Sequence, residues 1–298
     1  MLEAVIPAAG RGVRFLPLTK EQPKELLPVV DRPVIHYVVE EASRAHIDKV
    51  LIITGRHKRS LLEDYFDSSP DLERLEGGNV ASVLSSFDHL PKIHFTRQAE
   101  PRGLGDAILR AKAFVSADEG FFAVMLGDTI NVSRKPVVGQ LIDAYRSLKG
   151  VDGVIAVEEV KEEKVRDYGI VEPGGKCCGG RGCYVRKLIE KPSPSQTTSR
   201  LGITGTYVLS KKVFDYLEKV KPDKRGEIQL TDALQLMVEQ GLRIVGYRFE
   251  GKRYDIGDMM TWMKANLELS FLDPRYGARL REHAASLLGK EPAGGRTS

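Results

Sequence analysis

Short apolar runs that alternate with amphipathic stretches constrain the fold of this 298-residue chain most strongly. The runs at 4–6, 49–54 and 121–126 each have the length and composition of a buried β-strand. Between them, the spacing of apolar side chains in 33–46 and 57–67 predicts helices with one buried face, on which Leu61, Leu62, Tyr65 and Phe66 would lie in the second helix. Strands and helices in such short alternation favour a parallel, doubly wound sheet.

After residue 158 the sequence no longer shows the regular alternation of strands and helices. Strand-like segments and loops alternate in 159–201, which predicts antiparallel strands in a smaller subdomain laid over the main sheet. A late strand at 244–249 and a helical stretch at 259–285 follow, and the last dozen residues are expected to be disordered. We therefore expect an α/β fold with a Rossmann-like, three-layer mixed sheet and a small antiparallel subdomain.

The composition is that of a globular protein, with 42% hydrophobic and 29% charged residues. A net charge of only +4 does not favour nucleic acid as a partner, although clustered arginines and lysines could bind a polyanionic small molecule. No stretch approaches the roughly 18 apolar residues of a membrane span, and the N-terminus has no signal-peptide pattern. These features predict a cytoplasmic protein that does not bind membranes.

The three cysteines, Cys177, Cys178 and Cys183, lie together in a glycine-rich segment. A metal site would use all three as thiolate ligands, but the C-C-x4-C spacing matches no common zinc pattern and no histidine lies nearby. We interpret the segment as the tip of a hairpin with reduced thiols.

The loop after the first strand carries groups suited to a nucleoside triphosphate. Gly10 and Gly12 let the backbone approach a ligand, and successive N–H groups in such a turn form a concavity for phosphate. Arg14 and Lys24 add mobile positive charge. Two glycines alone are more often part of a plain turn, so the interpretation as a phosphate-binding loop depends on the rest of the segment.

The segment 4–29 resembles the signature of the sugar-1-phosphate nucleotidylyltransferases, G-x-G-T-R-x-x-P-x-T-x-x-x-P-K. The positions in register are Gly10, Gly12, Arg14, Pro17, Thr19, Pro23 and Lys24. Val13 departs from it, because the family usually has Thr there, and any phosphate contact at this position would fall to backbone N–H groups. Within the family the closest resemblance is to the bacterial-type UTP–glucose-1-phosphate uridylyltransferases, and it covers about 3–272 in at least five motifs. It implies that the nucleotide is bound by Ala8, Ala9, Gly10 and Gly12.

Gln98 and Gly103 follow the strand predicted at 92–97, and ligands of such sheets bind beyond the carboxyl ends of the strands. An amide can donate and accept at once, which suits the O4/N3–H edge of uracil, and a glycine lets the backbone touch the base plane. The residues alone are explained better by a turn that begins a helix. The family reads Q-x-x-P-x-G-L-G-H-A here, so the resemblance implies that Gln98 and Gly103 hold the base, while Asp106 replaces its His.

Asp128 follows the apolar run 121–126 and would point into the ligand crevice. Its hard oxygen atoms suit Mg²⁺, which accompanies triphosphates, although a turn or a helix cap explains a single Asp equally well. The uridylyltransferases typically read G-D-D here, and Thr129 replaces the second acid. The resemblance implies that Asp128 and Asp255 bind Mg²⁺.

Glu190 and Lys191 place an acceptor-only group beside a donor-only group, as a sugar phosphate requires. Such a pair is more often a solvated surface, but the E-K-P pattern matches the family. The resemblance gives the glucose hydroxyls to Glu190 and its phosphate to Lys191, and it places Gly169 and Gly205 around the sugar. The run GEIQLTDA at 226–233 favours the uridylyl branch over the thymidylyl branch.

The resemblance implies that 1–272 form the nucleotidyltransferase domain, with a nucleotide-binding part at about 1–158 and a sugar-binding part at about 159–258. Residues 259–298 would form a C-terminal helical segment and tail. The implied reaction joins UTP and glucose 1-phosphate to UDP-glucose and pyrophosphate by Mg²⁺-assisted in-line attack. Arg14 and Lys24 would be the catalytic groups, with Lys24 near the α-phosphate.

Two alternatives remain open for the function. The nearer one is another nucleotidylyltransferase, with dTTP or CTP as the substrate. The other is a non-catalytic, nucleotide-sensing subunit, which is disfavoured because Lys24, Asp128 and Asp255 are all present.

Members of this branch form dimers or tetramers, so the resemblance also implies a homo-oligomer. The C-terminal segment could pack on a symmetric partner through Trp262, Leu267, Leu269, Phe271 and Leu272. An amphipathic helix that covers its own sheet explains the same residues equally well.

Overall fold

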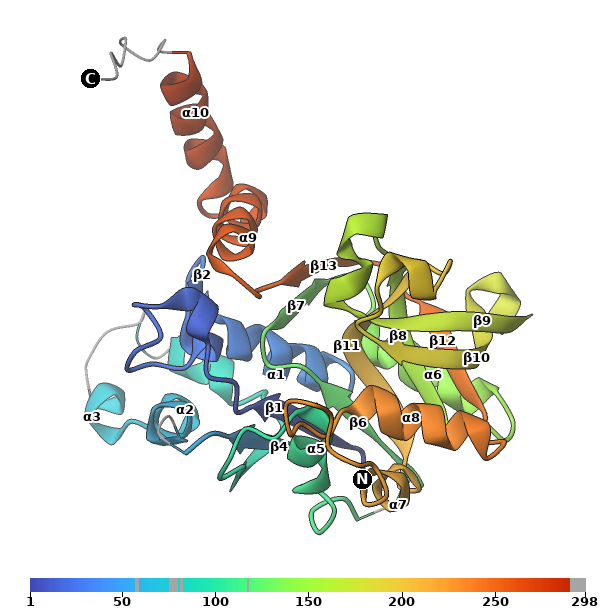
Figure 1. Ribbon diagram of the computed structural model, residues 1–298. Helices are drawn as coiled ribbons and strands as arrows, with labels where there is room; N and C mark the ends of the chain where they lie inside the picture. The colour runs from blue at the N-terminus through green and yellow to red at the C-terminus, as the bar shows by residue number, and fades with distance from the viewer. Residues whose placement is uncertain (57–58, 75–79, 81–82, 117, 290–298) are drawn as a thin grey trace.

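The computed structural model describes residues 1–298 except 57–58, 75–79, 81–82, 117 and 290–298. Its centre is a nine-stranded sheet with the strand order β5-β4-β1-β6-β11-β8-β12-β10-β9 (Figure 1). The strands are β1 (Glu3–Ala8), β4 (Lys49–Thr54), β5 (Lys92–Arg97), β6 (Phe121–Met125), β8 (Gly153–Glu159), β9 (Gly169–Cys177), β10 (Gly182–Glu190), β11 (Leu201–Ser210) and β12 (Ile244–Arg248).

The sheet is parallel in its first half and mixed in its second. Strands β5, β4, β1 and β6 run parallel, which confirms the prediction from the strand–helix alternation. Strand β11 is antiparallel to both β6 and β8, and β9 is antiparallel to β10 because only a short turn joins them. The antiparallel strands therefore extend the main sheet and do not lie over it. Since β9 also pairs with the start of β11, this end of the sheet closes on itself.

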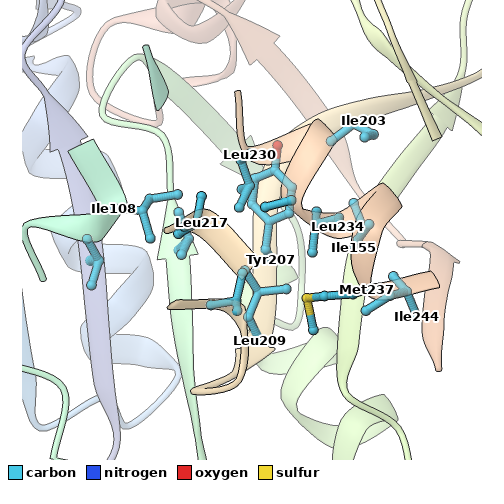
Figure 2. Packing of buried hydrophobic residues seen from close by; sticks show 14 of the residues in the cluster. Ile108, Ile155, Ile203, Tyr207, Leu209, Leu217, Leu230, Leu234, Met237 and Ile244 are labelled. Atoms are coloured by element: carbon cyan, nitrogen blue, oxygen red, sulfur yellow. The ribbon is translucent and has the colours of Figure 1, made fainter. Parts of the chain in front are cut away.

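Helices cover both faces of the sheet, so the predicted three layers are confirmed (Figure 1). One face carries α1 (Val34–Arg44), α2 (Arg59–Phe66) and α6 (Val137–Ser147), and the other carries α5 (Leu104–Leu109), α7 (Val213–Leu217) and α8 (Leu230–Glu239). Alternate residues of a strand face opposite layers. In β1, Ala4 and Ile6 pack in the first layer and Val5 packs in the second. Figure 2 shows the second layer, where the helices α5, α7 and α8 meet the side chains of β11.

The early helices begin close to their predicted positions. Helix α1 begins at Val34, one residue after Pro33, and its His36 packs against Tyr65 with 3.0 Å between Nδ1 and the phenol oxygen. In α2, Leu62 is buried as predicted, but the prediction for Leu61 is wrong because its side chain is exposed. Residues 57–58 of that predicted helix lie outside the described residues. The irregular segment that follows contains the short helices α3 (Pro70–Glu73) and η3 (Ser85–Phe87).

A small third core lies outside the main sheet and supports the opening loop. The loop contains the single turns η1 (Val13–Phe15) and η2 (Lys24–Leu26) and the strand pair β2 (Pro28–Val29) and β3 (Arg32–Pro33). Beside it, β7 (Thr129–Val132) pairs antiparallel with β13 (Lys252–Asp255). Phe15 and Leu27 from the loop pack with Ile130, Ile256 and Ala265. This cluster fixes the loop against the edge where β6 ends.

The C-terminal segment forms two helices, α9 (Met259–Leu272) and α10 (Gly277–Leu288), and not one. Pro274 disfavours helical geometry at Asp273, which is extended and ends α9. Asp258 caps α9, with the Thr261 N–H donating to Oδ1 at 2.9 Å. The residues after 289, where the tail is predicted to be disordered, lie outside the described chain.

The apolar side chains of α9 divide between the protein core and the surface. Trp262 and Leu269 pack against the third core, whereas Leu267 and Leu272 are exposed. Helix α10 projects away from the rest of the protein (Figure 1). Across the described part of the chain, no helix is both long and apolar enough to cross a membrane.

The remaining short helices lie in the connections of the second half. They are η4 (Glu162–Asp167), η5 (Cys178–Gly180) and η6 (Pro194–Gln196). Cys177 and Cys183 lie at the end of the β9–β10 hairpin as half-buried thiols, which confirms the hairpin. The side chain of Cys178 lies outside the described atoms. Among the residues described, no group of three or more His, Cys, Asp or Glu side chains could hold a metal ion.

Candidate active site

Most of the predicted site residues line two neighbouring cavities. A cavity of about 550 Å³ is lined by Ala9, Gly10, Lys24, Gln98 and Gly103, together with Arg11, Glu25, Arg225 and Glu227. A second cavity of about 220 Å³ is lined by Gly169, Glu190, Lys191, Gly205 and Asp255, together with Tyr168, Thr231 and Arg253. Leu104, Leu126 and Asp128 line both cavities. The two predicted halves of the site therefore meet at Asp128.

A larger cavity of about 820 Å³ lies elsewhere, between the end of α1 and the start of α6. None of the predicted site residues lines it. Several of its charged side chains already pair with one another, as Lys135 does with Asp143 and Arg146 with Glu119. The chemistry predicted from the sequence is at the two smaller cavities.

Lys24 lies at the centre of the site, where it forms an ion pair with Asp128. Only 15% of the Lys24 side chain and 20% of the Asp128 side chain are exposed. Burial by itself would lower the pKa of Lys24. The negative charges of Asp128, Glu25 and Asp255, together with the hydrogen bond to Asp128, outweigh burial and raise its pKa above the ordinary value. Lys24 is therefore a fixed positive charge at neutral pH.

The pairing of β7 with β13 brings the two predicted metal ligands together. Thr129 lies opposite Asp255, and the N–H of Ile256 donates to the carbonyl of Asp128 at 2.9 Å. Asp128, which directly precedes β7, thus lies beside the end of β13 that carries Asp255, although the two aspartates are far apart in the sequence. Arg253 Nη1 lies 3.2 Å from Asp255 Oδ2 and partly neutralises that carboxylate.

This pair of carboxylates fits the requirements of Mg²⁺. Magnesium in nucleotide sites usually takes one or two protein carboxylates and completes its octahedron with phosphate oxygens and water. Asp128 and Asp255 supply that number of hard oxygen ligands; Asp128 lines both cavities and Asp255 lines the smaller one.

Gly103 is required at its position because nothing larger fits. Its φ of +95° is unfavourable for other residues, and a Cβ there would lie 2.5 Å from the carbonyl oxygen of Ile228. The segment around Ile228 is held by backbone bonds, since its N–H donates to Arg102 and its carbonyl accepts from Gly105. The motif at 226–233 therefore packs against the loop that contains Gly103. Its Glu227 lines the 550 Å³ cavity, and its Gln229, Leu230 and Thr231 line the 220 Å³ cavity.

Gln98 lies at the end of β5, and its side chain is almost completely buried at the cavity wall. Its Nε2 donates to the carboxylate of Asp106 at 2.7 Å and to the carbonyl of Gly103 at 3.2 Å. The expectation that the amide donates to the base while it accepts is therefore not met. Both amide hydrogens are directed into the protein, and the oxygen is the atom left for a ligand.

The smaller cavity presents a carboxylate, a hydroxyl and an ammonium group. Thr231 donates to Glu190 Oε2 at 2.7 Å, and Lys191 Nζ lies 3.5 Å from Glu190 Oε1. Lys191 has a φ of +43°, an uncommon value for a residue other than glycine, and this turn directs the chain away from β10. Tyr207 lines this cavity, and its ring packs among the buried side chains of the second layer (Figure 2). Burial and the charge of Glu190 raise the pKa of its phenol.

Gly205 shapes the boundary between the cavities. Its φ is +92°, and a Cβ would lie 2.6 Å from Cδ1 of Leu126, one of the residues shared by both cavities. Gly169 lies opposite Glu190 in the β9–β10 ladder. A Cβ on Gly169 would lie 3.2 Å from Glu190 Oε2, so the residue leaves that carboxylate accessible.

Three predicted site residues lie outside both cavities. Ala8 is buried in the core beside Ala9, and Gly12 accepts a hydrogen bond from Thr19 at 2.6 Å in the turn of the loop. Arg14 is exposed and faces the start of α9. Asp258 lies at that position, and its pKa is lowered mainly because its carboxylate accepts a hydrogen bond from the Thr261 backbone N–H. The positive charge of Arg14 lowers the pKa of Asp258 further.

Several cavity residues were not predicted. Arg11 lines the 550 Å³ cavity, which Arg14 does not line. Glu25 is buried beside Lys24, Arg253 is two residues before Asp255, and Thr231 lies in the run 226–233. Their positions next to predicted residues were the signal available in the sequence.

Comparison with known proteins gives a consistent set of relatives. The family model described as "Nucleotidyl transferase" matches residues 3–270. The UTP–glucose-1-phosphate uridylyltransferase of Bacillus subtilis (strain 168) is 42% identical over 97% of this chain and 98% of its own length. The protein of the same name from Staphylococcus epidermidis (strain ATCC 12228) is 42% identical over 94% of this chain and 96% of its own.

Solved structures agree with these relatives. A UDP-glucose pyrophosphorylase complexed with UDP-glucose is 36% identical, with a TM-score of 0.81 and coverage of 90% of this chain and 98% of its own. The UTP-bound UGPase from Acinetobacter baumannii is 33% identical, with a TM-score of 0.84 and coverage of 96% and 99%.

Proposed function

The chain belongs to the nucleotidyl transferase family, in the branch of the bacterial UTP–glucose-1-phosphate uridylyltransferases, and from this premise we propose that it joins UTP and glucose 1-phosphate to UDP-glucose and pyrophosphate. One observation carries the assignment to this site. A nucleotide-sized cavity and a smaller cavity with groups for a sugar phosphate meet at Asp128, which Lys24 contacts. Two substrates bound in these cavities would present their reacting phosphates to each other at that point.

The reaction requires positioning and charge neutralisation more than proton transfer. A phosphate oxygen of glucose 1-phosphate, already anionic near neutral pH, attacks the α-phosphorus of UTP, and the bond from that phosphorus to the bridging oxygen of pyrophosphate breaks. The nucleophile needs no general base. Bringing two polyanions together is the main barrier, so fixed cations and in-line orientation would supply most of the catalysis.

The lysines divide this work between them. Lys24 lies at the junction of the cavities, where we assign it to the α-phosphate, because its raised pKa keeps it charged throughout the reaction. Lys191 lies in the smaller cavity and would hold the phosphate of the sugar. Glu190, oriented by the hydroxyl of Thr231, would accept hydrogen bonds from the glucose hydroxyls.

Asp128 and Asp255 would hold Mg²⁺, which supplies charge neutralisation at the phosphates when it is bound. Arg253 reduces the repulsion between the neighbouring carboxylates through its contact with Asp255. The protein residues therefore prepare an acidic edge whose charge is partly balanced by Lys24 on one side and Arg253 on the other.

The test is pyrophosphate release from a panel of nucleoside triphosphates with glucose 1-phosphate held at saturation. We expect UTP to give the highest kcat/KM, dTTP to follow, and CTP and the purine triphosphates to react far more slowly. A preference for dTTP over UTP of tenfold or more would replace the uridylyltransferase by a thymidylyltransferase. Substitution of the sugar 1-phosphate in the same assay determines whether glucose is the preferred hexose.

We also propose that the protein forms a homo-oligomer through its C-terminal helices. The exposed apolar side chains of α9 and α10 include Met260, Met263, Leu267, Leu272, Leu280, Leu287 and Leu288. Apolar residues exposed on a helix that projects from the protein are suited to a symmetric partner surface. Light scattering at micromolar concentration should give a dimer or tetramer. A species of 33 kDa, the mass of one chain, would contradict the proposal.

A further inference from the structure

We propose that Asp106 fixes the orientation of the Gln98 amide, and that this orientation selects a base with an N3–H group over cytosine. Asp106 does not line the nucleotide cavity, so it would act as a positioning residue through Gln98. The inference rests on the proposed function, because it assumes that the base binds beside Gln98. It concerns this chain in particular, since the family resemblance has His at this position.

The orientation of the amide follows from its two neighbours. The carboxylate of Asp106 lies 2.7 Å from Nε2 and the carbonyl oxygen of Gly103 lies 3.2 Å from it. Both neighbours can only accept hydrogen bonds, because a carboxylate and a carbonyl have no hydrogen to give. The NH₂ group must therefore face them and the oxygen must face the other way. The chemistry of the two neighbours alone fixes this orientation.

Asp106 is itself held firmly. It lies in the first turn of α5, where a negative charge is favoured by the helix dipole, and its side chain is buried. Its second oxygen accepts a hydrogen bond from Arg110 at 2.6 Å, one helical turn further along. The short contacts on both oxygens leave the carboxylate no freedom to turn away from Gln98. The arginine also balances a charge that would otherwise be costly to bury.

The fixed amide offers a ligand an acceptor and no donor. Uracil and thymine both carry a hydrogen on N3 and can donate it to the Gln98 oxygen. Cytosine has an unprotonated N3, so two acceptors would face each other and both would remain unpaired. A site that is built to pair with one such group rejects an analogue without it more strongly than a site that only measures size.

Without Asp106 the amide could rotate by half a turn. Its NH₂ group could then face the base and donate to N3 of cytosine, at the cost of only the long contact to Gly103. The enzyme would lose its bias against cytosine and keep its fold and its phosphate-binding groups. The structural role and the selective role of Asp106 are separable on this basis.

The experiment compares two variants of one residue. Asp106→Leu has nearly the same shape but cannot accept a hydrogen bond. Asp106→Asn has a single acceptor oxygen, which Arg110 takes, so its NH₂ group would face Gln98 and turn the amide oxygen of Gln98 away from the base. For each protein, kcat/KM is measured with UTP and with CTP, and the affinities for UDP and CDP are measured by calorimetry without turnover. Asp143→Leu, which removes an exposed helical aspartate from an ion pair with Lys135, is the matched control.

We expect the UTP-to-CTP ratio to fall about 10- to 100-fold in Asp106→Leu, the effect of losing a hydrogen bond to a charged group. The ratio should fall in Asp106→Asn as well, and it should stay within about threefold of wild type in the control. The UDP-to-CDP affinity ratio should change in parallel. A folded Asp106→Leu protein with the wild-type ratio would overturn the inference. If the leucine does not fit, Asp106→Ala is measured in its place, with the same expected and contradicting results.

The outcomes for the two proposals are distinct. A wild-type protein that neither binds UDP nor uses UTP would count against the proposed function itself. A wild-type protein that strongly prefers UTP, with an unchanged preference in Asp106→Leu, would count against the role of Asp106 alone.

Discussion

Replacing Lys24 by Met tests the reasoning about the site most directly. The change removes the ammonium group from among Asp128, Glu25 and Asp255 but keeps an unbranched side chain in the same space. Two separate effects follow from the structure. The transition state loses a fixed cation, and the folded protein loses the countercharge of carboxylates that lie close together.

Both magnitudes can be worked from the geometry. Removing one preorganised donor from a site of developing charge lowers kcat about 10²- to 10³-fold. Breaking a buried ion pair costs about 3–5 kcal/mol and breaking a surface pair costs about 1 kcal/mol or less. The Lys24–Asp128 pair lies between these limits, with side chains 15% and 20% exposed. We therefore expect the variant to be less stable by about 2–3 kcal/mol.

The pH dependence of the stability loss is fixed in sign. The pKa of Lys24 is raised in the folded protein, so the folded state holds the proton more tightly than the unfolded state does. The stabilisation is complete below the ordinary pKa of 10.5 and is lost only as the pH rises through the folded value. The difference in unfolding free energy between wild type and variant should thus stay constant from neutral pH to about pH 10.

Steady-state kinetics and urea unfolding measure the two effects. Lys20→Met is the matched control, because Lys20 is exposed in the same loop and lines neither cavity. We expect the control to keep wild-type kcat and stability. Adding Asp128→Asn to both Lys24 forms completes a double-mutant cycle for the stability coupling. A Lys24→Met enzyme with more than a tenth of the wild-type kcat, or a cycle without coupling, would refute the assignment.

The remaining predictions concern the other charged groups. Lys191→Ala should raise the KM for glucose 1-phosphate about tenfold or more and leave the affinity for UTP nearly unchanged. Weaker UTP binding with an unchanged KM for the sugar phosphate would mean that the two cavities were assigned in reverse. Asp128→Asn and Asp255→Asn should each lower kcat on the order of 10²-fold, and EDTA should abolish wild-type activity until Mg²⁺ is added. Full activity of Asp128→Asn would contradict its assignment as a metal ligand. When kcat is measured against pH, it should not decrease on the alkaline side below about pH 10, because the nearby carboxylate charges outweigh the effect of burial and raise the pKa of Lys24. A loss of kcat centred near pH 8 would contradict this.

The fold was predictable where a local pattern determines the structure. Buried strands such as 49–54 and 121–126 are continuous apolar runs, and their alternation with helices left few other arrangements. The return of β9 to pair with β11 was not predictable, because it depends on the curvature of the assembled sheet. The break between α9 and α10 is predictable from Pro274, which disfavours helical geometry at Asp273. The prediction of one continuous helical stretch did not take this proline into account.

The site was predictable to the extent that a motif names its residues. Lys24, Gln98, Glu190 and Asp255 all line the cavities, although they come from separate segments. The partners of these residues were not predictable, since the contact of Lys24 with Asp128 spans 104 positions and depends on the tertiary fold. A motif also gives no direction for a side chain, which is why Arg14 was expected in the site but lies outside both cavities.

Gln98 shows why a residue type alone does not give specificity. From the sequence, an amide can match a base with a donor and an acceptor together, but the fold uses its donor on Asp106 and Gly103. In the proposed binding mode, recognition of O4 would come from another group, and the amide oxygen would read only the N3–H that UTP and dTTP share. The choice between those two nucleotides is left to the C5 methyl group and the 2′-hydroxyl. A single methyl group in a pocket changes selectivity by only about 1–3 kcal/mol, so we expect the preference for UTP over dTTP to be much smaller than the preference over CTP.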